Sequence, residues 1–518
     1  MNKYKVFVLL VTLGLSRICF PAQIEQEASI APSNKDVERT VPIQFYGTTS
    51  RYLWLDKQQL TNQAYDALDF ISTASIHGLF PDDYHYTTLR QLTPPQDEDT
   101  AQRFDVLLTD GLLSLIHDLA VGRFNPIEAD PHWFIPAKTF DAADFLQQAL
   151  LSKHLKTVLQ SLIPTSADYH KLTEAATRYQ SYVDRGGWRK IPSTQLLHPG
   201  DVHPHIPAIR TRLAFEDKDL VLTVDNHSTR YDSSLVHAVR RFQKTHSLKI
   251  DGIIGEDTLR EMNVSASTRL KQIKINLERR RWLPRTLGQR YVLINLASYK
   301  LFAIDNDTKK LDMRVIIGRE KRPTPSFASE LNHLVINPFW NVPKKLARLD
   351  LLPKQQANPD YFHLQAIRVF SKKNGRRIEH DPYLIDWQSV SRRHFPYILR
   401  QDPGEHNALG RFKFMFPNQW DIYLHDTPDK QLFNESKRSL SSGCIRVEDP
   451  EALANFTMPV DRSGKSIEEL INSKQNLGRR LADPLSIYAV YFTVWLDNNQ
   501  LLFSPDIYQR DQRMTKLL

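Results

Sequence analysis

One cysteine in the C-terminal part of the chain has neighbours that suit it to act as a nucleophile. Cys444 lies in the run Ser-Ser-Gly-Cys-Ile-Arg at residues 441–446, and the only other cysteine in the 518 residues is Cys19. A thiol is mostly protonated near neutral pH, and a nearby imidazole can convert it to the reactive thiolate. His425 lies nineteen residues before Cys444 and could supply that imidazole. The pair is the minimum set for covalent acyl transfer.

The residues next to this pair are candidates for supporting it. Gly443 permits a tight turn and close approach of a substrate, and backbone amides at this turn could form an oxyanion hole. Arg446 either holds a substrate carboxylate or braces the loop. Tyr423 lies two residues before His425 on an expected strand, so it should face the same side and either line the cleft or pack as a cross-strand aromatic. Asp426 alternates to the other face, so we do not nominate it as the third member of a triad.

Two other interpretations of the cysteine have to be weighed. A lone cysteine can be a small buried hydrophobe, and this reading stays open from the residue alone. A Cys and His pair can also bind metal, but structural zinc usually takes four Cys or His ligands at short spacings. The chain has neither a CxxC nor an HExxH motif. We therefore expect no metal and no cofactor.

The N-terminus has the layout of a secretory signal. A basic start precedes an apolar run at residues 6–15, and cleavage is plausible after Ala22, so we predict a signal peptide over residues 1–22. An uncleaved membrane anchor is the second interpretation and a lipid-modified Cys19 the third. Residues 23–41 are polar and are predicted to be a linker. Cysteines are normally paired in an oxidising compartment, so an exported chain with one unpaired thiol keeps it for its chemistry or buries it.

The charge balance bears on the partner. The formal net charge is +9, which suits an anionic neighbourhood without identifying it. The chain has no recognisable nucleic-acid reader motif, and an exported protein meets little nucleic acid, so nucleic acid is not expected. An anionic cell-wall polymer is the more natural partner.

The elements that must position the pair fall into three regions, as the length suggests. Residues 42–204 carry helical patterns, with leucines at helical spacing over 107–119 and Gly122 as the stop, and predict a helical scaffold domain. Residues 205–264 contain an amphipathic stripe, a turn at Gly252 and Gly255, and a further helix, which predict a compact unit with two helices packed on one short hydrophobic seam. Residues 265–288 form a helix-like, cationic linker.

From residue 289 the period changes from helical to alternating, which predicts a β-rich domain over 289–512. The expected strands are Tyr291–Leu296, Lys300–Ile304, Met313–Gly318 and Leu334–Asn337. A last strand-like run over 487–496 is followed by Asp-Asn-Asn and an apolar segment at 501–503. This pattern predicts a hairpin that returns the chain to the sheet.

These motifs, in this order, resemble a known family. His425-Asp426-Thr427 followed by Ser441-x-Gly443-Cys444-Ile445-Arg446 is similar to the signature of the YkuD-type L,D-transpeptidase catalytic domain. The blocks Thr324-Pro325-x-Phe327, Asn337-Pro338-x-Trp340-x-Val342-Pro343 and Pro403-Gly404-x-x-Asn407-Ala408-Leu409-Gly410 are similar to its long, multidomain periplasmic subclass in Gram-negative bacteria. The segments AVRRFQ and DGIIG resemble the three-helix peptidoglycan-binding module. A sortase-like enzyme would also use Cys, His and Arg, but the wall-binding module and the His-to-Cys order favour the transpeptidase.

The resemblance implies a multidomain α+β fold: a helical scaffold and a peptidoglycan-binding module, followed by a β-rich catalytic domain with a lid insertion at about 344–400. It implies that Cys444 attacks a peptidoglycan tetrapeptide stem at its third residue and that a second stem accepts the acyl group, with His425 relaying protons. By the same resemblance, Ser441 and a backbone carbonyl orient the site. Trp340 either shapes the cleft or is a core aromatic. The implied setting is the periplasm, and the implied role is cell-wall biogenesis and cell shape.

Several alternatives stay open at this level. An L,D-carboxypeptidase would resolve the same thioester with water, and a non-catalytic wall-binding scaffold would only organise partners. The acceptor could also be a lysine of an outer-membrane lipoprotein, and cell-wall synthesis proteins could recruit the enzyme. By the same resemblance, carbapenem β-lactams are expected to acylate Cys444.

Overall fold

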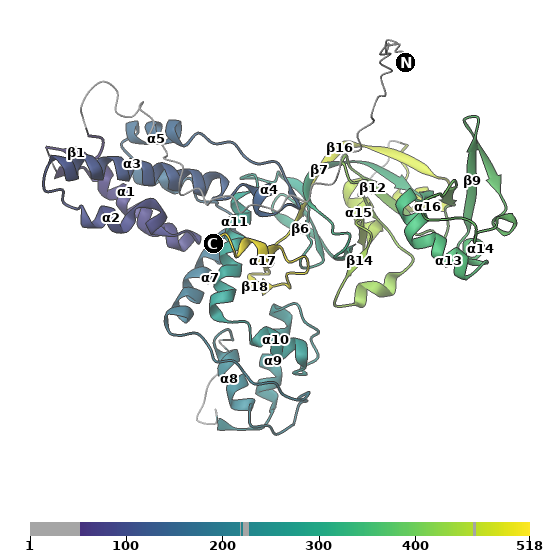
Figure 1. Ribbon diagram of the computed structural model, residues 1–518, viewed down its shortest axis with the longest axis horizontal. Helices are drawn as coiled ribbons and strands as arrows, with labels where there is room; N and C mark the ends of the chain where they lie inside the picture. The colour runs from purple at the N-terminus through teal and green to yellow at the C-terminus, as the bar shows by residue number, and fades with distance from the viewer. Residues whose placement is uncertain (1–51, 58, 218, 221–226, 459–462) are drawn as a thin grey trace, which may run out of the picture. The chain divides into compact units, whose positions relative to one another are not determined.

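The structure is a computed structural model that describes residues 52–57, 59–217, 219–220, 227–458 and 463–518 (Figure 1). All of these residues belong to one compact unit, Val41–Leu518. The predicted signal peptide and polar linker lie outside the described residues. Within the described ranges, no helix combines the length and the apolar character needed to cross a membrane.

The N-terminal part of this unit is helical, as the sequence predicts. Its elements are β1 (Leu55–Asp56), β2 (Gln59–Leu60), α1 (Asn62–Ser72), α2 (Tyr86–Gln91), α3 (Glu98–Val121), α4 (Pro126–Ala129), β3 (Trp133–Phe134), α5 (Ala142–Leu151), α6 (Leu155–Gln160) and α7 (Ala167–Asp184). Helix α3 contains the predicted leucine pattern, begins at a capping box between Asp97 and Thr100, and ends at Gly122. Its residues Phe104, Leu108, Leu112 and Leu115 are fully buried, so the helical spacing builds one continuous core with the neighbouring helices.

The predicted three-helix module is confirmed. Its helices are α8 (Ile206–Ala214), α9 (Ser233–Thr245) and α10 (Glu256–Met262), which share a separate hydrophobic core. Gly252 has a φ of 75°, a conformation that favours glycine, as the turn requires. Gly255 differs: it has a φ of −95° and caps the start of α10, so its backbone does not need glycine.

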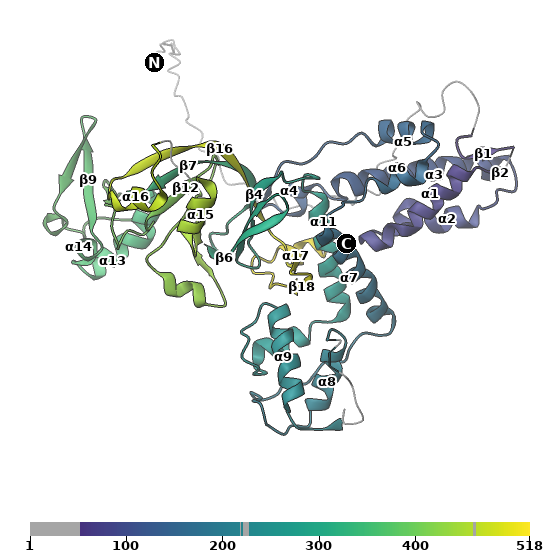
Figure 2. The same cartoon turned by 180° about the vertical axis from the view of Figure 1, so that it is seen from behind.

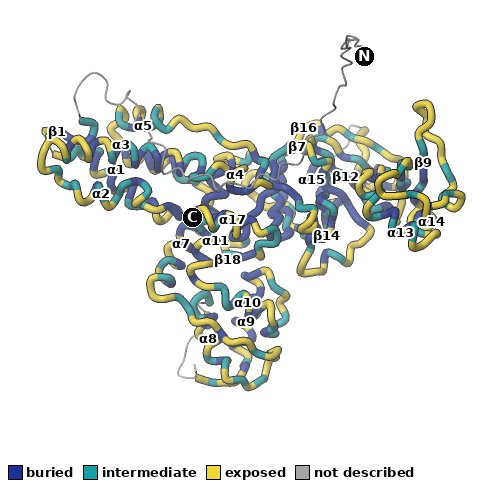
Figure 3. Tube along the Cα trace, viewed as in Figure 1, coloured by how far each residue is buried: buried dark blue, intermediate teal, exposed yellow. Residues whose placement is uncertain are grey.

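The segment predicted as a cationic linker forms α11 (Ala266–Arg281), and this helix is buried rather than solvated. Figure 3 shows the same burial along the chain. Each of its four buried arginines forms an ion pair, which offsets the cost of burying the charge: Arg269 with Glu261, Arg279 with Asp511, Arg280 with Asp168, and Arg281 with Glu278. The helix packs on α7, so it joins the scaffold to the C-terminal region as a structural element.

The C-terminal region is built on a ten-stranded sheet. Its strands are β4 (Arg290–Asn295), β5 (Lys300–Asp305), β6 (Thr308–Gly318), β7 (Ser326–Ile336), β12 (Phe412–Met415), β13 (Leu424–His425), β14 (Ser439–Ser441), β15 (Ile445–Val447) and β16 (Leu477–Val490), with β3 from the scaffold. The order is β12-β13-β15-β6-β5-β4-β16-β7-β3, β14 pairs with β6, and β12 also pairs with β7. Strands β7 and β16 run side by side over most of their length (Figures 1 and 2).

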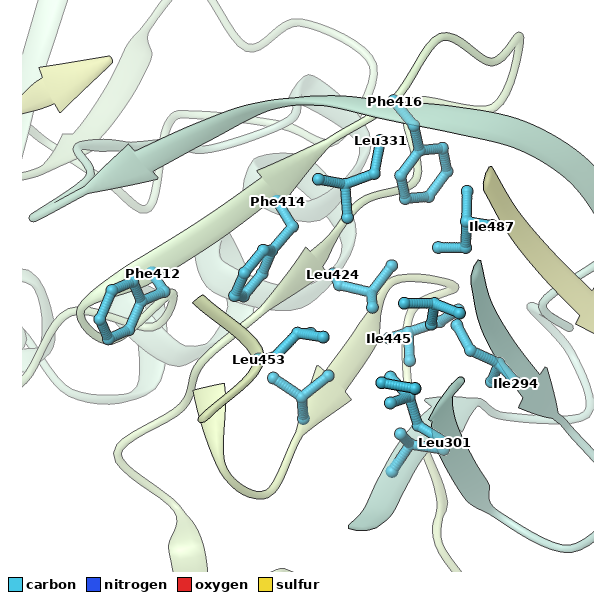
Figure 4. Close-up of a cluster of buried hydrophobic side chains, with 14 of the residues drawn as sticks. Ile294, Leu301, Leu331, Phe412, Phe414, Phe416, Leu424, Ile445, Leu453 and Ile487 are labelled. Carbon is cyan, nitrogen blue, oxygen red and sulfur yellow. The ribbon is translucent and has the colours of Figure 1, made fainter. Parts of the chain in front are cut away.

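Alternation along these strands separates a core face from an outer face. Figure 4 shows side chains of β12, β13 and β15, among them Phe414, Leu424 and Ile445, pointing into one apolar cluster. Helices α15 (Pro450–Thr457) and α16 (Ile467–Asn472) contribute to the same cluster. The residues between these inward positions must therefore face the other way, and the predicted catalytic residues are among them.

The prediction for the C-terminal strand was partly wrong. The run over 487–496 divides between β16 and β17 (Val494–Asp497), and β17 pairs only with β18 (Gln500–Phe503) in a separate two-stranded sheet. The hairpin exists, but it does not return to the main sheet. Between the end of β16 and the start of β17, side chains take the place of backbone pairing: the Phe492 amide donates to the Asn295 side chain, and the Thr493 hydroxyl donates to Asp511. Helix α17 (Arg510–Met514) follows.

The insertion predicted at about 344–400 folds around its own core. Its elements are α12 (Lys344–Leu346), the π-helical turn η6 (Ala347–Leu351), α13 (Leu352–Ala357), α14 (Tyr361–Leu364), β9 (Ile367–Lys373), β10 (Arg376–His380) and β11 (Ile398–Gln401), and the strand β8 (Trp340–Asn341) just before it pairs with β11. The strands form a four-stranded sheet in the order β10-β9-β11-β8. We call residues 344–400 the lid segment. Strand β10 and the turn that joins it to β9 are largely exposed, whereas Ile367, Val369 and Phe370 of β9 are buried (Figure 3).

Candidate active site

Five polar side chains share one face of the sheet where β12, β13 and β15 adjoin. Lys413 lies opposite His425 in the β12–β13 register, and His425 lies beside Arg446 in the parallel β13–β15 register. Tyr423 and Cys444 occupy the positions two residues earlier on the same face, and the Ile445 amide bonds to the Tyr423 carbonyl at 3.1 Å. The structure therefore brings four of the predicted residues together and adds Lys413, which the sequence analysis did not nominate.

His425 is held as a neutral base. Its Nδ1 lies 2.5 Å from the carbonyl oxygen of Asp426, which can only accept, so Nδ1 donates the proton. Its Nε2 then carries the free lone pair. Burial and the Arg446 guanidinium lower the pKa of His425 from 6.5 to about 3. The imidazole is thus uncharged at neutral pH, and its Nε2 lone pair is free to accept a hydrogen bond.

Cys444 is half-buried, and opposing influences act on its thiol. Burial raises the pKa of Cys444, while a hydrogen bond from Tyr423 and the charges of Lys413 and Arg446 work against that rise. The Lys413 ammonium lies 4.0 Å from the centre of the Tyr423 ring, and that ring is 5.6 Å from the His425 ring. The structure therefore has a protonated thiol and a neutral imidazole on the same face of the sheet at neutral pH.

The loop at residues 441–444, which we call the nucleophile loop after the predicted role of Cys444, is fixed by hydroxyl groups. Ser441 Oγ donates to the Cys444 carbonyl at 2.6 Å and accepts from the Gly443 amide at 3.1 Å. Buried Thr324 donates to the Gly443 carbonyl at 2.8 Å and accepts from the Gly318 amide at 2.9 Å. The Gly443 amide is thus engaged in the loop. Of the two predicted oxyanion donors, the Cys444 amide is the one that bonds to no other described residue.

Position 443 favours glycine because of its backbone conformation and not because of crowding. Its φ of 122° is one that side chains rarely adopt, yet a Cβ there would meet nothing closer than the Arg322 carbonyl oxygen at 4.0 Å. The crowded glycine lies elsewhere, at Gly410, where a Cβ would stand 2.2 Å from the Asp426 carboxylate. That carboxylate accepts from the Arg411 and Thr427 amides. Gly410 therefore lets Asp426 sit where its own carbonyl orients the histidine.

Arg446 braces the site in this structure. Its guanidinium is 3.3 Å from the Asp429 carboxylate and 3.5 Å from the Thr427 hydroxyl. Burial lowers its pKa, and its Nε has no hydrogen-bond partner among the described residues. A braced guanidinium with a spare donor next to His425 keeps that imidazole neutral by repelling a second positive charge.

Trp340 is not brought to this cluster. It pairs with Gln401 in the four-stranded sheet and packs against the apolar core of the lid segment. The sequence analysis missed Lys413 and Thr324. Alternation within a strand could have placed Lys413 on one face of β12, but its position opposite His425 depends on strand pairing. Across the described residues, no group of three or more His, Cys, Asp and Glu side chains could hold a metal ion.

Three family models match the chain in order. Residues 43–175 match the "Scaffold domain", 204–262 the "Putative peptidoglycan binding domain", and 289–465 the "L,D-transpeptidase catalytic domain", YkuD. The predicted order of a helical region, a peptidoglycan-binding domain and a β-rich catalytic domain is confirmed.

The chain also resembles a curated protein from Haemophilus influenzae, named "Putative L,D-transpeptidase". The two are 34% identical over 258 residues, which is 50% of this chain and 50% of that protein. The chain thus spans about half the length of the curated relative it matches.

Solved structures with detectable similarity include three L,D-transpeptidases. The Mycobacterium smegmatis protein is 12% identical and covers 39% of this chain and 58% of its own, with a TM-score of 0.20. The Xylanimonas cellulosilytica protein is 13% identical, covering 58% and 99%, with a TM-score of 0.18. The Stackebrandtia nassauensis protein is 11% identical, covering 58% and 97%, with a TM-score of 0.23.

Proposed function

The chain contains an L,D-transpeptidase catalytic domain of the YkuD family at residues 289–465, and we propose that this domain cross-links peptidoglycan through a cysteine thioester. The donor is a tetrapeptide stem, and the bond attacked joins its third residue, a diamino acid, to the terminal D-Ala. The acceptor is the side-chain amine of the third residue of a second stem. The product is a cross-link between two third-position residues.

The acylation half-reaction uses the two neutral groups. The Cys444 thiol gives its proton to His425 Nε2 as its sulfur attacks the carbonyl carbon, and the C–S bond forms. The resulting oxyanion is stabilised by the Cys444 amide. The C–N bond to D-Ala then breaks, and the histidine returns the proton to the leaving amine. A thioester on Cys444 and free D-Ala remain.

In the deacylation half-reaction, His425 takes a proton from the acceptor amine and the thiol regains its own. The acceptor amine attacks the thioester carbonyl, and His425 Nε2 takes a proton from the amine. The C–S bond breaks, the thiol regains its proton, and an amide joins the two stems. The two half-reactions together involve no net charge or redox change.

One observation carries this proposal: the Nδ1 proton of His425 is committed to the Asp426 carbonyl, so Nε2 is free on the sheet face that also holds Cys444. Ser441 clamps the nucleophile loop, and Arg446 and Tyr423 complete the polar face. The peptidoglycan-binding domain at residues 204–262 would hold the enzyme near its polymer. Activity on peptidoglycan implies that the protein works outside the cytoplasmic membrane, in the periplasm, after export by the predicted signal peptide.

Mass spectrometry of purified disaccharide tetrapeptide stems tests the proposal. The wild-type protein should produce stem dimers that have lost one D-Ala, and the Cys444→Ala and His425→Ala variants should not. Tripeptide monomers without dimers would show that water resolves the thioester and would make the protein an L,D-carboxypeptidase. No change in the stems would favour the non-catalytic scaffold. A carbapenem provides a second readout, because we expect an intact-mass adduct on wild-type protein that Cys444→Ala lacks.

A further inference from the structure

A pair of arginines lies against the nucleophile loop and has no part in the chemistry above. Arg319 and Arg322 are in the tight turn that follows β6, where the Arg322 amide bonds to the Arg319 carbonyl at 2.8 Å. The turn is anchored to the loop, since the Arg319 amide bonds to the Ser441 carbonyl at 3.0 Å. The pairing of β14 with β6 sets Ser441 beside Gly318. The arginines are thus held in place before any ligand binds.

Both guanidinium groups converge on Ser442, two residues before Cys444. Arg319 Nη2 donates to the Ser442 hydroxyl at 2.8 Å, and Arg322 Nη1 donates to the same oxygen at 2.9 Å. The Ser442 hydroxyl thus accepts from two guanidinium groups, and because it is uncharged it neutralises neither. Such a fork of donors matches the two oxygens of a carboxylate.

A carboxylate of the lid segment already occupies this fork. Arg322 Nη1 lies 2.7 Å from Asp350 Oδ2, and Arg319 Nη2 lies 3.8 Å from Asp350 Oδ1. Asp350 belongs to η6 of the lid segment. Among the described residues, Asp350 is the only carboxylate that forms an ion pair with either arginine. Glu320, in the same turn, pairs instead with Lys437 at 3.1 Å. One carboxylate thus serves two guanidinium groups, which leaves one positive charge uncompensated.

The surrounding charge also favours an anion. The lid segment holds twelve Lys or Arg and five Asp or Glu, a formal charge of +7 against +9 for the whole chain. The arginines remain partly open to solvent, with side-chain exposures of 45% for Arg319 and 18% for Arg322. A ligand can therefore reach them.

We propose that Arg319 and Arg322 form a binding subsite for the terminal carboxylate of the donor stem, and that Asp350 occupies this subsite when no stem is bound. The inference rests on the proposed function, because it assigns the ligand from that reaction. In the donor stem, the carboxylate lies one residue beyond the attacked carbonyl, as the subsite lies close to Cys444. Stem binding then displaces Asp350 and loosens the ion pair that ties the lid segment to the nucleophile loop.

Binding measurements in the Cys444→Ala background test this subsite without turnover. Isothermal titration compares a tetrapeptide stem that ends in a free carboxylate with the same stem ending in a carboxamide. We expect the free acid to bind about ten-fold more tightly, which is the effect of about 1.4 kcal/mol. Adding Arg322→Gln should remove that preference. Adding Asp350→Asn should tighten binding of the acid and leave the amide unchanged, because it removes only a competing carboxylate.

A matched control separates this competition from a general loosening of the lid segment. Glu379→Gln breaks another ion pair there, with Arg368, in which Arg368 Nε lies 2.6 Å from Glu379 Oε1. We expect this variant to change neither affinity. Equal binding of the acid and the amide would overturn the subsite, as would an Asp350→Asn variant that shifts both affinities alike. Absence of binding by either stem would also overturn it.

The outcome is distinguishable from that of the cross-linking test. An acid preference that depends on Arg322, without any stem dimers from the wild-type protein, would leave the subsite standing and remove the transpeptidase. Stem dimers from a protein that binds the acid and the amide stem equally would support the transpeptidase and remove the subsite.

Discussion

Replacing Ser441 by alanine should weaken the nucleophile loop out of proportion to the size of the change. Ser441 is buried, with 5% of its surface exposed, and its hydroxyl serves two backbone groups of the loop. Alanine leaves the Cys444 carbonyl and the Gly443 amide without these partners. An unsatisfied buried polar group costs about 1–3 kcal/mol. Two such groups would cost about 2–6 kcal/mol, but the carbonyl of half-buried Cys444 can be partly hydrated. We therefore expect the free energy of unfolding to fall by about 2–4 kcal/mol.

Activity should fall as well, because the loop positions both the thiol and the oxyanion donor. A displacement of about 1 Å in a catalytic site can cost about a hundred-fold in rate. Urea unfolding measures the stability, and the rate of stem dimer formation at a temperature where both proteins are folded measures the activity.

Ser473→Ala is a matched control, because its hydroxyl donates to the Leu470 carbonyl at 2.7 Å away from the site. It should lower stability by about 1 kcal/mol and leave the rate unchanged. If Ser441→Ala matched Ser473→Ala in both measurements, the clamp would have no role and the reasoning would be refuted.

Three further predictions concern the polar face. Lys413→Met should raise the pKa of the Cys444 thiol, because it removes a cation that favours the thiolate, and iodoacetamide alkylation at fixed pH should slow; an unchanged rate would exclude the electrostatic role. Gly410→Ala should destabilise the protein far more than Gly464→Ala, since both glycines have positive φ but only Gly410 faces a carboxylate at 2.2 Å; equal urea midpoints would contradict this. The pKa of His425 is lowered from 6.5 to about 3, so between these pH values His425 is protonated in the unfolded chain and neutral in the native state. The contribution of His425 to the free energy of unfolding is therefore fully present above pH 6.5 and is lost as the pH falls toward 3, by at most about 1.4 kcal/mol per pH unit. The free energy of unfolding of His425→Gln, measured between pH 7 and 4, should depend less steeply on pH.

Local spacing allowed much of the architecture to be predicted. The leucines of α3 recur at the helical period and its end is marked by Gly122, so a single helix with one buried face was predictable. Alternation over β4, β5 and β6 indicated strands in the same way. The buried helix α11 was harder, because its three consecutive arginines read as solvated until their partners in distant segments are known.

The order of the strands could not be derived from the sequence. Tyr423 and His425 share a face by alternation within one strand, and Cys444 and Arg446 share a face within another. That these two strands are parallel neighbours, and that β12 adds Lys413 on the other side, depends on which edges pair in a ten-stranded sheet. Pairing of that kind is set by the packing of the whole core.

The sequence by itself determined the chemistry on offer: one thiol with a glycine before it, one histidine at the end of a strand, and residue patterns that resemble a cell-wall acyltransferase. Only the tertiary structure decided the state of that chemistry. It buried His425 against the Asp426 carbonyl so that the imidazole is neutral, and it placed Asp350 of the lid segment on Arg322, twenty-eight residues away along the chain. Residue type fixes which protons and charges a side chain can carry, whereas burial and long-range neighbours fix which of them it does carry.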